Sequence, residues 1–191
     1  DIKSDNGNSI IIPRKALNLL KATLPTENTD VTIDFNMANA FFKFGNIRMI
    51  CRLIDERFPD YENVIPSQNP IKMTISRTDL LGSLKRISIY ANKTTHQVRL
   101  KITGSELQVS AEDLDFSNEA NERLSCEHEG EDIEIGFNAK FLIEMLSNLD
   151  TDQIKLNMSA PNKAGVIFPA EKEKGEDILM LVMPVMLNQY A

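Results

Sequence analysis

Two histidines and two cysteines are the side chains of this sequence that most often support catalysis or metal binding. His96 and His128 lack cysteine or carboxylate partners at metal-ligand spacing, and Cys51 and Cys126 lie in alternating strand patterns. The sequence contains no nucleophile motif and no glycine-rich phosphate loop before a helix. We therefore expect a protein that binds partners and is not an enzyme, with no metal and no cofactor.

The chemistry that the sequence does support is contact with phosphate groups from basic helix faces. Three segments with apolar residues at helical spacing begin at Pro13, Arg77 and Asn138. Together they carry a net charge of +5, whereas the whole chain carries −7. Such segregation of charge suits a surface that meets a DNA backbone without reading bases. Charge alone favours ordinary solvated helix faces over a DNA-binding surface, and this alternative stays open.

Length and composition indicate a soluble protein. The 191 residues are 42% hydrophobic and 26% charged, which allows a sizeable core. No apolar run approaches the roughly 18 residues that span a bilayer, and the segment from Asp1 to Asp5 resembles no signal peptide. Two cysteines in a chain of this length do not form a disulfide framework. We expect a cytoplasmic protein without a membrane anchor.

A repeated order of elements must position the basic helices. One strand, one helix and about three strands recur in residues 9–66, 71–129 and 132–187. The first copy is expected to begin with a strand at Ile10–Ile12, the second is expected to contain one strand from Leu124 to Gly130, and the last strand of the third copy is expected to end at Pro184. In the second copy, Ser83, Lys85 and Arg86 are expected on the exposed face of the helix.

The repeat predicts an α+β fold with antiparallel sheets outside and helices on one face. Two copies would form one two-layer domain, so residues 67–191 are expected to form a complete domain and residues 1–66 half of another. The sequence is then expected to be truncated at its N-terminus. The proline-containing segment from Arg57 to Pro66 would connect the two parts.

Three short motifs carry a resemblance to a known family. They are Arg57-Phe58-Pro59-Asp60-Tyr61 with a following valine and proline, Ile135-Gly136-Phe137-Asn138, and Val182-Met183-Pro184-Val185. In this order and spacing they resemble the bacterial DNA sliding clamp, the beta subunit of DNA polymerase III. The resemblance covers the second half of the middle clamp domain and all of the third, C-terminal domain. It implies the DNA-clamp fold, a ring of two crescent-shaped subunits with helices lining the hole.

The resemblance also implies a function, that of a processivity factor in DNA replication. A closed ring would encircle double-stranded DNA without sequence preference and tether the DNA polymerase III alpha subunit. The clamp loader and repair proteins would bind the same hydrophobic pocket through short peptides. The full-length protein would be a homodimer, with no contact to membranes.

Site residues follow from the matched positions. The partner-peptide pocket would include Pro59, Val64, Thr95, Asn138, Phe141, Gly165, Met183, Pro184, Val185, Met186 and Leu187. The residues implied to face DNA are Arg14, Lys15, Lys21, Lys85, Arg86 and Lys140. The residues implied at the subunit interface are Ile89, Tyr90, Asp113, Asp115, Glu119 and Glu122.

Some positions depart from the family pattern. Asn63 stands where an arginine is familiar, Met186 replaces a basic residue, and Asn188 to Ala191 extend past the usual terminus and could alter the pocket. Without a first domain, the chain is expected not to close the head-to-tail ring. The alternative interpretation is a peptide-binding adaptor with no DNA contact.

Overall fold

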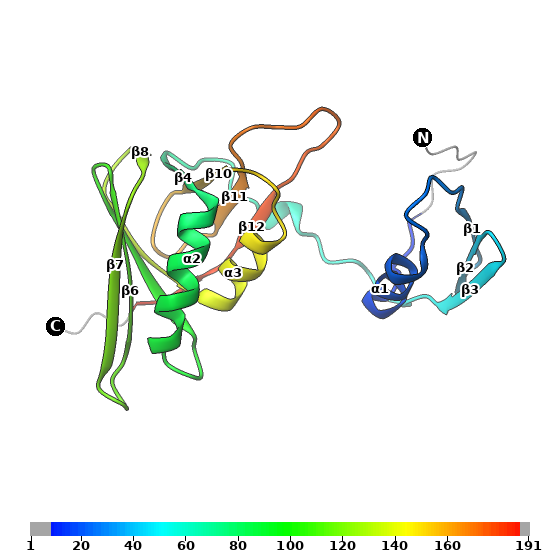
Figure 1. The fold of residues 1–191 in the computed structure, drawn as a ribbon, viewed down its shortest axis with the longest axis horizontal. Helices are drawn as coiled ribbons and strands as arrows, with labels where there is room; N and C mark the ends of the chain where they lie inside the picture. The colour runs from blue at the N-terminus through cyan, green and yellow to red at the C-terminus, as the bar shows by residue number, and fades with distance from the viewer. Residues whose placement is uncertain (1–8, 188–191) are drawn as a thin grey trace. The chain divides into compact units, whose positions relative to one another are not determined.

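Residues 9–187 are described by the structure, a computed structural model, and fall into two units, Asp1–Asp60 and Tyr61–Ala191 (Figure 1). The residues beyond this range include the terminal extension Asn188 to Ala191, so its expected effect on the pocket lies outside the described residues. The domain boundaries predicted above, 1–66 and 67–191, stay a prediction. No helix in residues 9–187 is long and apolar enough to cross a membrane.

Over its described residues, from position 9 onward, the smaller unit has one helix and one three-stranded sheet. Its elements are α1 (Arg14–Thr23), β1 (Thr32–Phe35), β2 (Asn39–Phe44) and β3 (Ile47–Arg52), with the antiparallel order β1-β2-β3. The central strand supplies the buried residues of this unit, Ala40, Phe42 and Phe44. The tight turn between β2 and β3 places Gly45 at φ 51°, a conformation that glycine adopts without strain.

The strand expected at Ile10–Ile12 is not formed. In this segment the Ile11 carbonyl accepts a hydrogen bond from the amide of Ile54, two residues after the end of β3, at 3.0 Å. One such bond does not make a strand ladder. Ile10 and Ile12 instead pack against the small core beneath α1.

Up to position 187, where its described part ends, the larger unit has two α-helices, two 3-10 helices and two five-stranded sheets. Its elements are η1 (Glu62–Val64), β4 (Ile71–Ser76), α2 (Arg77–Ile87), η2 (Ser88–Tyr90), β5 (Gln97–Thr103), β6 (Glu106–Asp113), β7 (Asn118–Ser125), β8 (Glu127–Glu129), β9 (Ile133–Asn138), α3 (Ala139–Ser147), β10 (Gln153–Met158), β11 (Gly165–Pro169), β12 (Met180–Val182) and β13 (Pro184–Val185). Figure 1 shows α2 and α3 side by side.

The two sheets exchange strands between the repeated copies. One sheet has the order β12-β11-β10-β4-β8 and the other β13-β9-β5-β6-β7. The strand β4, which precedes α2, therefore lies in the sheet with β10, β11 and β12, which follow α3. The strand β9, which precedes α3, lies in the sheet with β5, β6 and β7, which follow α2. This exchange joins the copies into one hydrophobic core, in which Met73, Leu84, Leu100, Ile135 and Leu142 are almost fully buried.

Two local expectations for the larger unit are wrong. Pro184 begins β13 and does not end the last strand, because the chain passes from one sheet to the other at Met183. The segment expected as one strand at Leu124 to Gly130 is divided in the same way, between β7 and β8, at the buried Cys126. A hydrophobic pattern of period two continues through both crossings, so it carries no sign of them.

Candidate functional site

Helix α2 carries the basic pair Lys85 and Arg86 in its last turn, where cations interact favourably with the helix dipole. The Ser76 hydroxyl caps the other end by accepting a hydrogen bond from the Asp79 amide at 3.3 Å. Ser83, expected on the exposed face, is fully buried because α2 packs closely against β6 and β7 on that side. The exposed surface of α2 is consequently narrower than the sequence predicts.

Arg77 fixes α2 against α3. Its Nε donates to the Thr151 carbonyl at 2.7 Å, its Nη1 donates to the Leu146 carbonyl at 3.2 Å, and its backbone amide donates to the Asp152 carbonyl at 2.9 Å. These bonds satisfy carbonyls around the C-terminal end of α3. Arg77 belongs to none of the predicted site residues, because a cation at a helix start gives no signal of such distant partners in the sequence.

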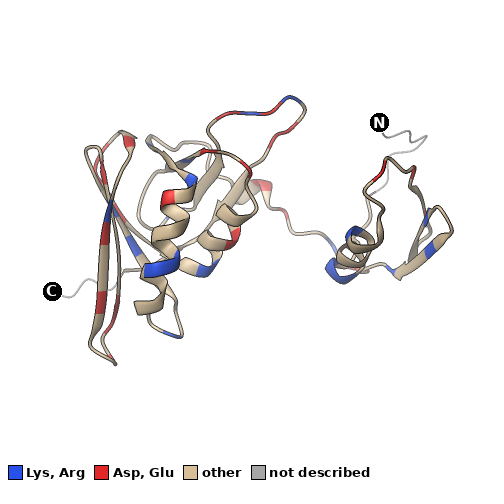
Figure 2. Cartoon of the chain, viewed as in Figure 1, with Lys and Arg blue, Asp and Glu red and all other residues tan. Residues whose placement is uncertain are grey.

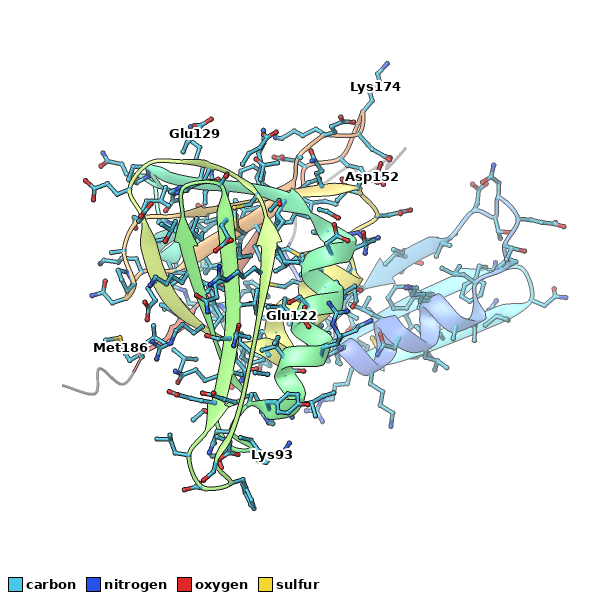
Figure 3. The ribbon with its side chains drawn as sticks, turned by 60° about the vertical axis from the view of Figure 1, so that its left-hand side comes forward. Lys93, Glu122, Glu129, Asp152, Lys174 and Met186 are labelled. Carbon is cyan, nitrogen blue, oxygen red and sulfur yellow. The ribbon has the colours of Figure 1, made fainter. Side chains whose placement is uncertain are left out.

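Arg86, predicted to face DNA, is bound to Glu122, predicted at the subunit interface. The guanidinium donates from Nε to Oε1 and from Nη2 to Oε2, both at 2.7 Å, so the pair is bidentate. The hydrogen bond from Arg86 lowers the pKa of the Glu122 carboxyl. The same bond raises the pKa of Arg86. Figure 3 labels Glu122 where β7 approaches α2.

The other cations of the larger unit's helices remain on its surface. Lys85 and Lys140 are exposed, and neither ammonium group makes a hydrogen bond or ion pair within residues 9–187. Lys140 lies in the first turn of α3. Figure 2 shows the basic residues on the two helices and several acidic ones along the strands of the neighbouring sheet. In the smaller unit, Arg14, Lys15 and Lys21 are exposed on α1.

Four of the predicted pocket residues meet at one end of β9. Asn138 donates from Nδ2 to the Thr95 carbonyl at 3.1 Å, and its Oδ1 caps α3 by accepting from the Lys140 amide at 2.9 Å. Pro184 and Val185 of β13 pair with Phe137 and Gly136 of β9. The C-terminal strand thus lies directly beside the start of α3.

Gly136 permits this close approach, and it is not among the predicted site residues. A Cβ atom at this position would lie 2.5 Å from the Val185 carbonyl oxygen and 2.7 Å from Cδ2 of Leu187. The signal available in the sequence is the glycine inside the Ile135 to Asn138 motif, at a strand position that otherwise favours larger residues.

The remaining pocket residues differ in accessibility. Val64, Phe141, Met183 and Met186 are large apolar side chains that are more than half exposed. Gly165 is buried, and its Cα faces the side chains of Leu156, Phe137 and Val182. Pro59 is exposed in the smaller unit.

The predicted interface residues lie around the edge strand β7. Ile89 and Tyr90 of η2 are exposed, as are Asp115 and Glu119. Asp113 is buried, with 3% of its surface accessible, and its Oδ1 accepts a hydrogen bond from the Asp115 amide at 3.2 Å. Its carboxylate therefore shapes the turn after β6 and is not exposed at the surface where the resemblance implies an interface.

Two kinds of chemistry find no support in the described part of the chain. Residues 9–187 contain no group of three or more histidine, cysteine or acidic residues that could hold a metal ion. Cys126 is buried in the core of the larger unit, and burial raises the pKa of its thiol, which disfavours the reactive thiolate.

Comparison with known families gives the identity of the two units. The family model described as the DNA polymerase III beta subunit, C-terminal domain, matches residues 62–185, and the model of the central domain matches residues 1–60. The chain belongs to the DNA polymerase III beta subunit family. Its fold class is accordingly that of the sliding clamps, as the motifs predicted.

Individual relatives agree with this assignment. The beta sliding clamp of Pseudomonas putida is 27% identical over 186 residues, which cover 97% of this chain and 50% of the relative. The beta sliding clamp of Proteus mirabilis is 31% identical over 152 residues, which cover 78% of this chain and 41% of the relative. The chain spans about half the length of the curated relatives it matches.

Solved structures agree as well. A crystal structure of the Pseudomonas aeruginosa sliding clamp bound to griselimycin matches with a TM-score of 0.90 and 27% identity, over 97% of this chain and 49% of that one. The sliding clamp of Bartonella birtlesii, also bound to griselimycin, matches with a TM-score of 0.83 and 28% identity, over 93% and 47% of the two chains.

Proposed function

We propose that the chain is part of a ring-shaped sliding clamp that encircles duplex DNA and tethers the replicative polymerase to it. In this proposal the protein is a non-catalytic processivity factor in the cytoplasm, and its full-length form is a head-to-tail homodimer. The observation that carries the proposal is the pair of adjacent helices α2 and α3, which expose Lys85 and Lys140 in a chain of the clamp family.

The physical basis is loose electrostatic contact with phosphates. Exposed lysines neutralise phosphate charge without fixing a sequence register, since the contact depends on counterion release and weakens with salt. Contacts of this kind hold a duplex inside a closed ring while allowing it to slide. An overall charge of −7 keeps other surfaces from binding DNA non-specifically.

Lys85→Gln tests the DNA contact. We expect the variant to bind a short duplex more weakly, and the slope of log K against log salt to become shallower by about 0.9, the value for one phosphate contact. Fluorescence anisotropy of a labelled duplex across a salt series measures both quantities. Lys174→Gln, in the exposed loop between β11 and β12, is the matched control and should leave the slope unchanged. Equal slopes for wild type and Lys85→Gln would favour an adaptor without DNA contact.

The peptide pocket is the second part of the proposal. The exposed side chains of Phe141, Met183 and Met186 support it, because flexible methionines adapt to several apolar ligands. Titrating a short apolar peptide of the polymerase type against the chain and against Met183→Ala measures this contact. We expect the alanine variant to bind several-fold more weakly. Equal affinity would remove Met183 from the proposed pocket.

A further inference from the structure

Arg86 and Glu122 join two layers of the larger unit. Arg86 lies in the last turn of α2, and Glu122 lies on β7, the last strand of its sheet. The side chains are 62% and 27% exposed, so the carboxylate is the more enclosed partner. On the helix side, Ser83 is fully buried beside this contact. The ion pair therefore links the last turn of α2 to the edge strand β7.

A phosphate group would have to displace this carboxylate to bind Arg86. Both oxygens of Glu122 already occupy the planar donor pair of the guanidinium, which is the geometry that a phosphate would use. A displaced Glu122 would remain as an unpaired charge, on a side chain that is 27% exposed, next to a second anion. Lys85 has neither obstacle, since its ammonium is exposed and unpaired within residues 9–187.

We propose that Arg86 is a positioning residue that fastens β7 to α2, and that Glu122 withholds it from DNA. This inference rests on the proposed DNA-binding function and narrows the residues that perform it. Lys85 then makes the phosphate contact at the end of α2. Because Glu122 is paired with Arg86, it does not form an ion pair with a partner subunit. Replacing Glu122 by an uncharged residue is consequently expected to strengthen DNA binding.

The decisive comparison is between the wild type and the double variant Arg86→Gln/Glu122→Gln, which loses the pair without changing net charge. We expect its affinity for a short duplex and its salt slope to equal those of the wild type. Glu122→Gln alone frees the guanidinium, so we expect tighter binding and a slope steeper by about 0.9. Lys85→Gln, the neighbouring cation, should lose about 0.9 in slope and serves as the reference for a true contact.

Two results would overturn the proposal. The first is a double variant that loses as much salt slope as Lys85→Gln, because Arg86 would then contact phosphate in the wild type. The second is a Glu122→Gln variant with unchanged DNA affinity, since release of the guanidinium is what the pairing predicts. If Glu122 did not withhold Arg86 from DNA, Glu122→Gln would gain no phosphate contact, and its salt slope would equal that of the wild type.

Hydrogen exchange separates this inference from the proposed function. We expect amides of β7 to exchange at least several-fold faster in Arg86→Gln and in Glu122→Gln, and to recover in the charge-swapped variant Arg86→Glu/Glu122→Arg. Unchanged exchange in both single variants would overturn the fastening role whether or not DNA binds. If no variant and no wild type binds DNA, the proposed function fails, and the DNA-withholding part of the inference fails with it.

Discussion

Single side chains determine where the two helices of the larger unit begin. Ser76 and Asn138 each end a strand and cap the helix that follows, by accepting a hydrogen bond from an early helix amide. The side-chain amide nitrogen of Asn138 also donates a hydrogen bond to the Thr95 carbonyl. One residue thus links α3 to the loop before β5, beside the strand β13 that contributes to the proposed pocket.

Asn138→Ala should destabilise the larger unit by about 1–2 kcal/mol, which combines the loss of a helix cap with the loss of a side-chain hydrogen bond. Asn138→Asp keeps an acceptor at the cap and removes the donor to Thr95, so it should cost less. Urea unfolding followed by circular dichroism measures both. An alanine variant as stable as the wild type would contradict the capping role.

Glu122 should make stability depend on pH in a defined direction. Its pKa is lowered in the folded protein by the bond to Arg86, so its contribution is fully present above the unfolded pKa of roughly 4.3. The contribution disappears as the pH falls through the folded pKa, while Arg86 stays protonated throughout. We expect Glu122→Gln to be less stable than the wild type at pH 7, and the difference to shrink at pH 3. A difference that is constant with pH would contradict the ion pair.

Among the elements, β13 depends most on one position of its neighbour. Gly136→Ala would place a methyl group within 2.7 Å of both Val185 and Leu187, so β13 must move away from β9. We expect a destabilisation of about 1–3 kcal/mol, typical of overpacking. In Gly82→Ala on α2, the new Cβ would meet only Nη1 of Arg86, at 3.3 Å, which is not one of the two nitrogens paired with Glu122. That control should be neutral or more stable by up to about 1 kcal/mol.

Thermal unfolding and peptide titration measure the consequences for β13. Gly136→Ala should lower both the melting temperature and the affinity for an apolar peptide, because Pro184 and Val185 lie on the displaced strand. Wild-type peptide affinity in this variant would show that β13 does not shape the proposed pocket.

The sequence predicts the helices well, because their period, caps and apolar faces are local properties. It does not predict that Ser83 is buried or that the chain changes sheets at Cys126 and Met183, since these depend on strands distant in sequence. The same limit applies to the site. The motif around Asn138 identifies its cap and its neighbours, whereas the pairing of Arg86 with Glu122 joins residues 36 positions apart and leaves no local pattern.

At the scale of the whole molecule, the described residues 9–187 form two hydrophobic cores of unequal size. In this part of the chain, three residues are buried in the core of the smaller unit, whereas the core of the larger unit spans both of its sheets. A small core buries little apolar surface to offset the conformational entropy that the chain loses on folding. We therefore expect β1 to β3 to exchange amide protons faster than β5, β6 and β9.

Phe42→Ala and Leu100→Ala test this division of the chain. Each substitution removes a nearly inaccessible side chain from one core and should cost about 2–5 kcal/mol in its own unit. Hydrogen exchange followed by mass spectrometry should show faster exchange in β1 to β3 for Phe42→Ala and in β5, β6 and β9 for Leu100→Ala. Equal responses in both units to either substitution would contradict independent cores.

The central claim is that this chain supplies part of a ring around DNA. A full-length chimera tests it most directly, with this chain replacing the matching half of the Pseudomonas putida beta sliding clamp. Gel filtration after enzymatic loading onto a nicked circular plasmid measures retention. The account predicts that the chimera stays on the circle at moderate salt and is released when the plasmid is cut once, because a ring slides off a free end. Retention on linear DNA equal to that on circular DNA would contradict encirclement.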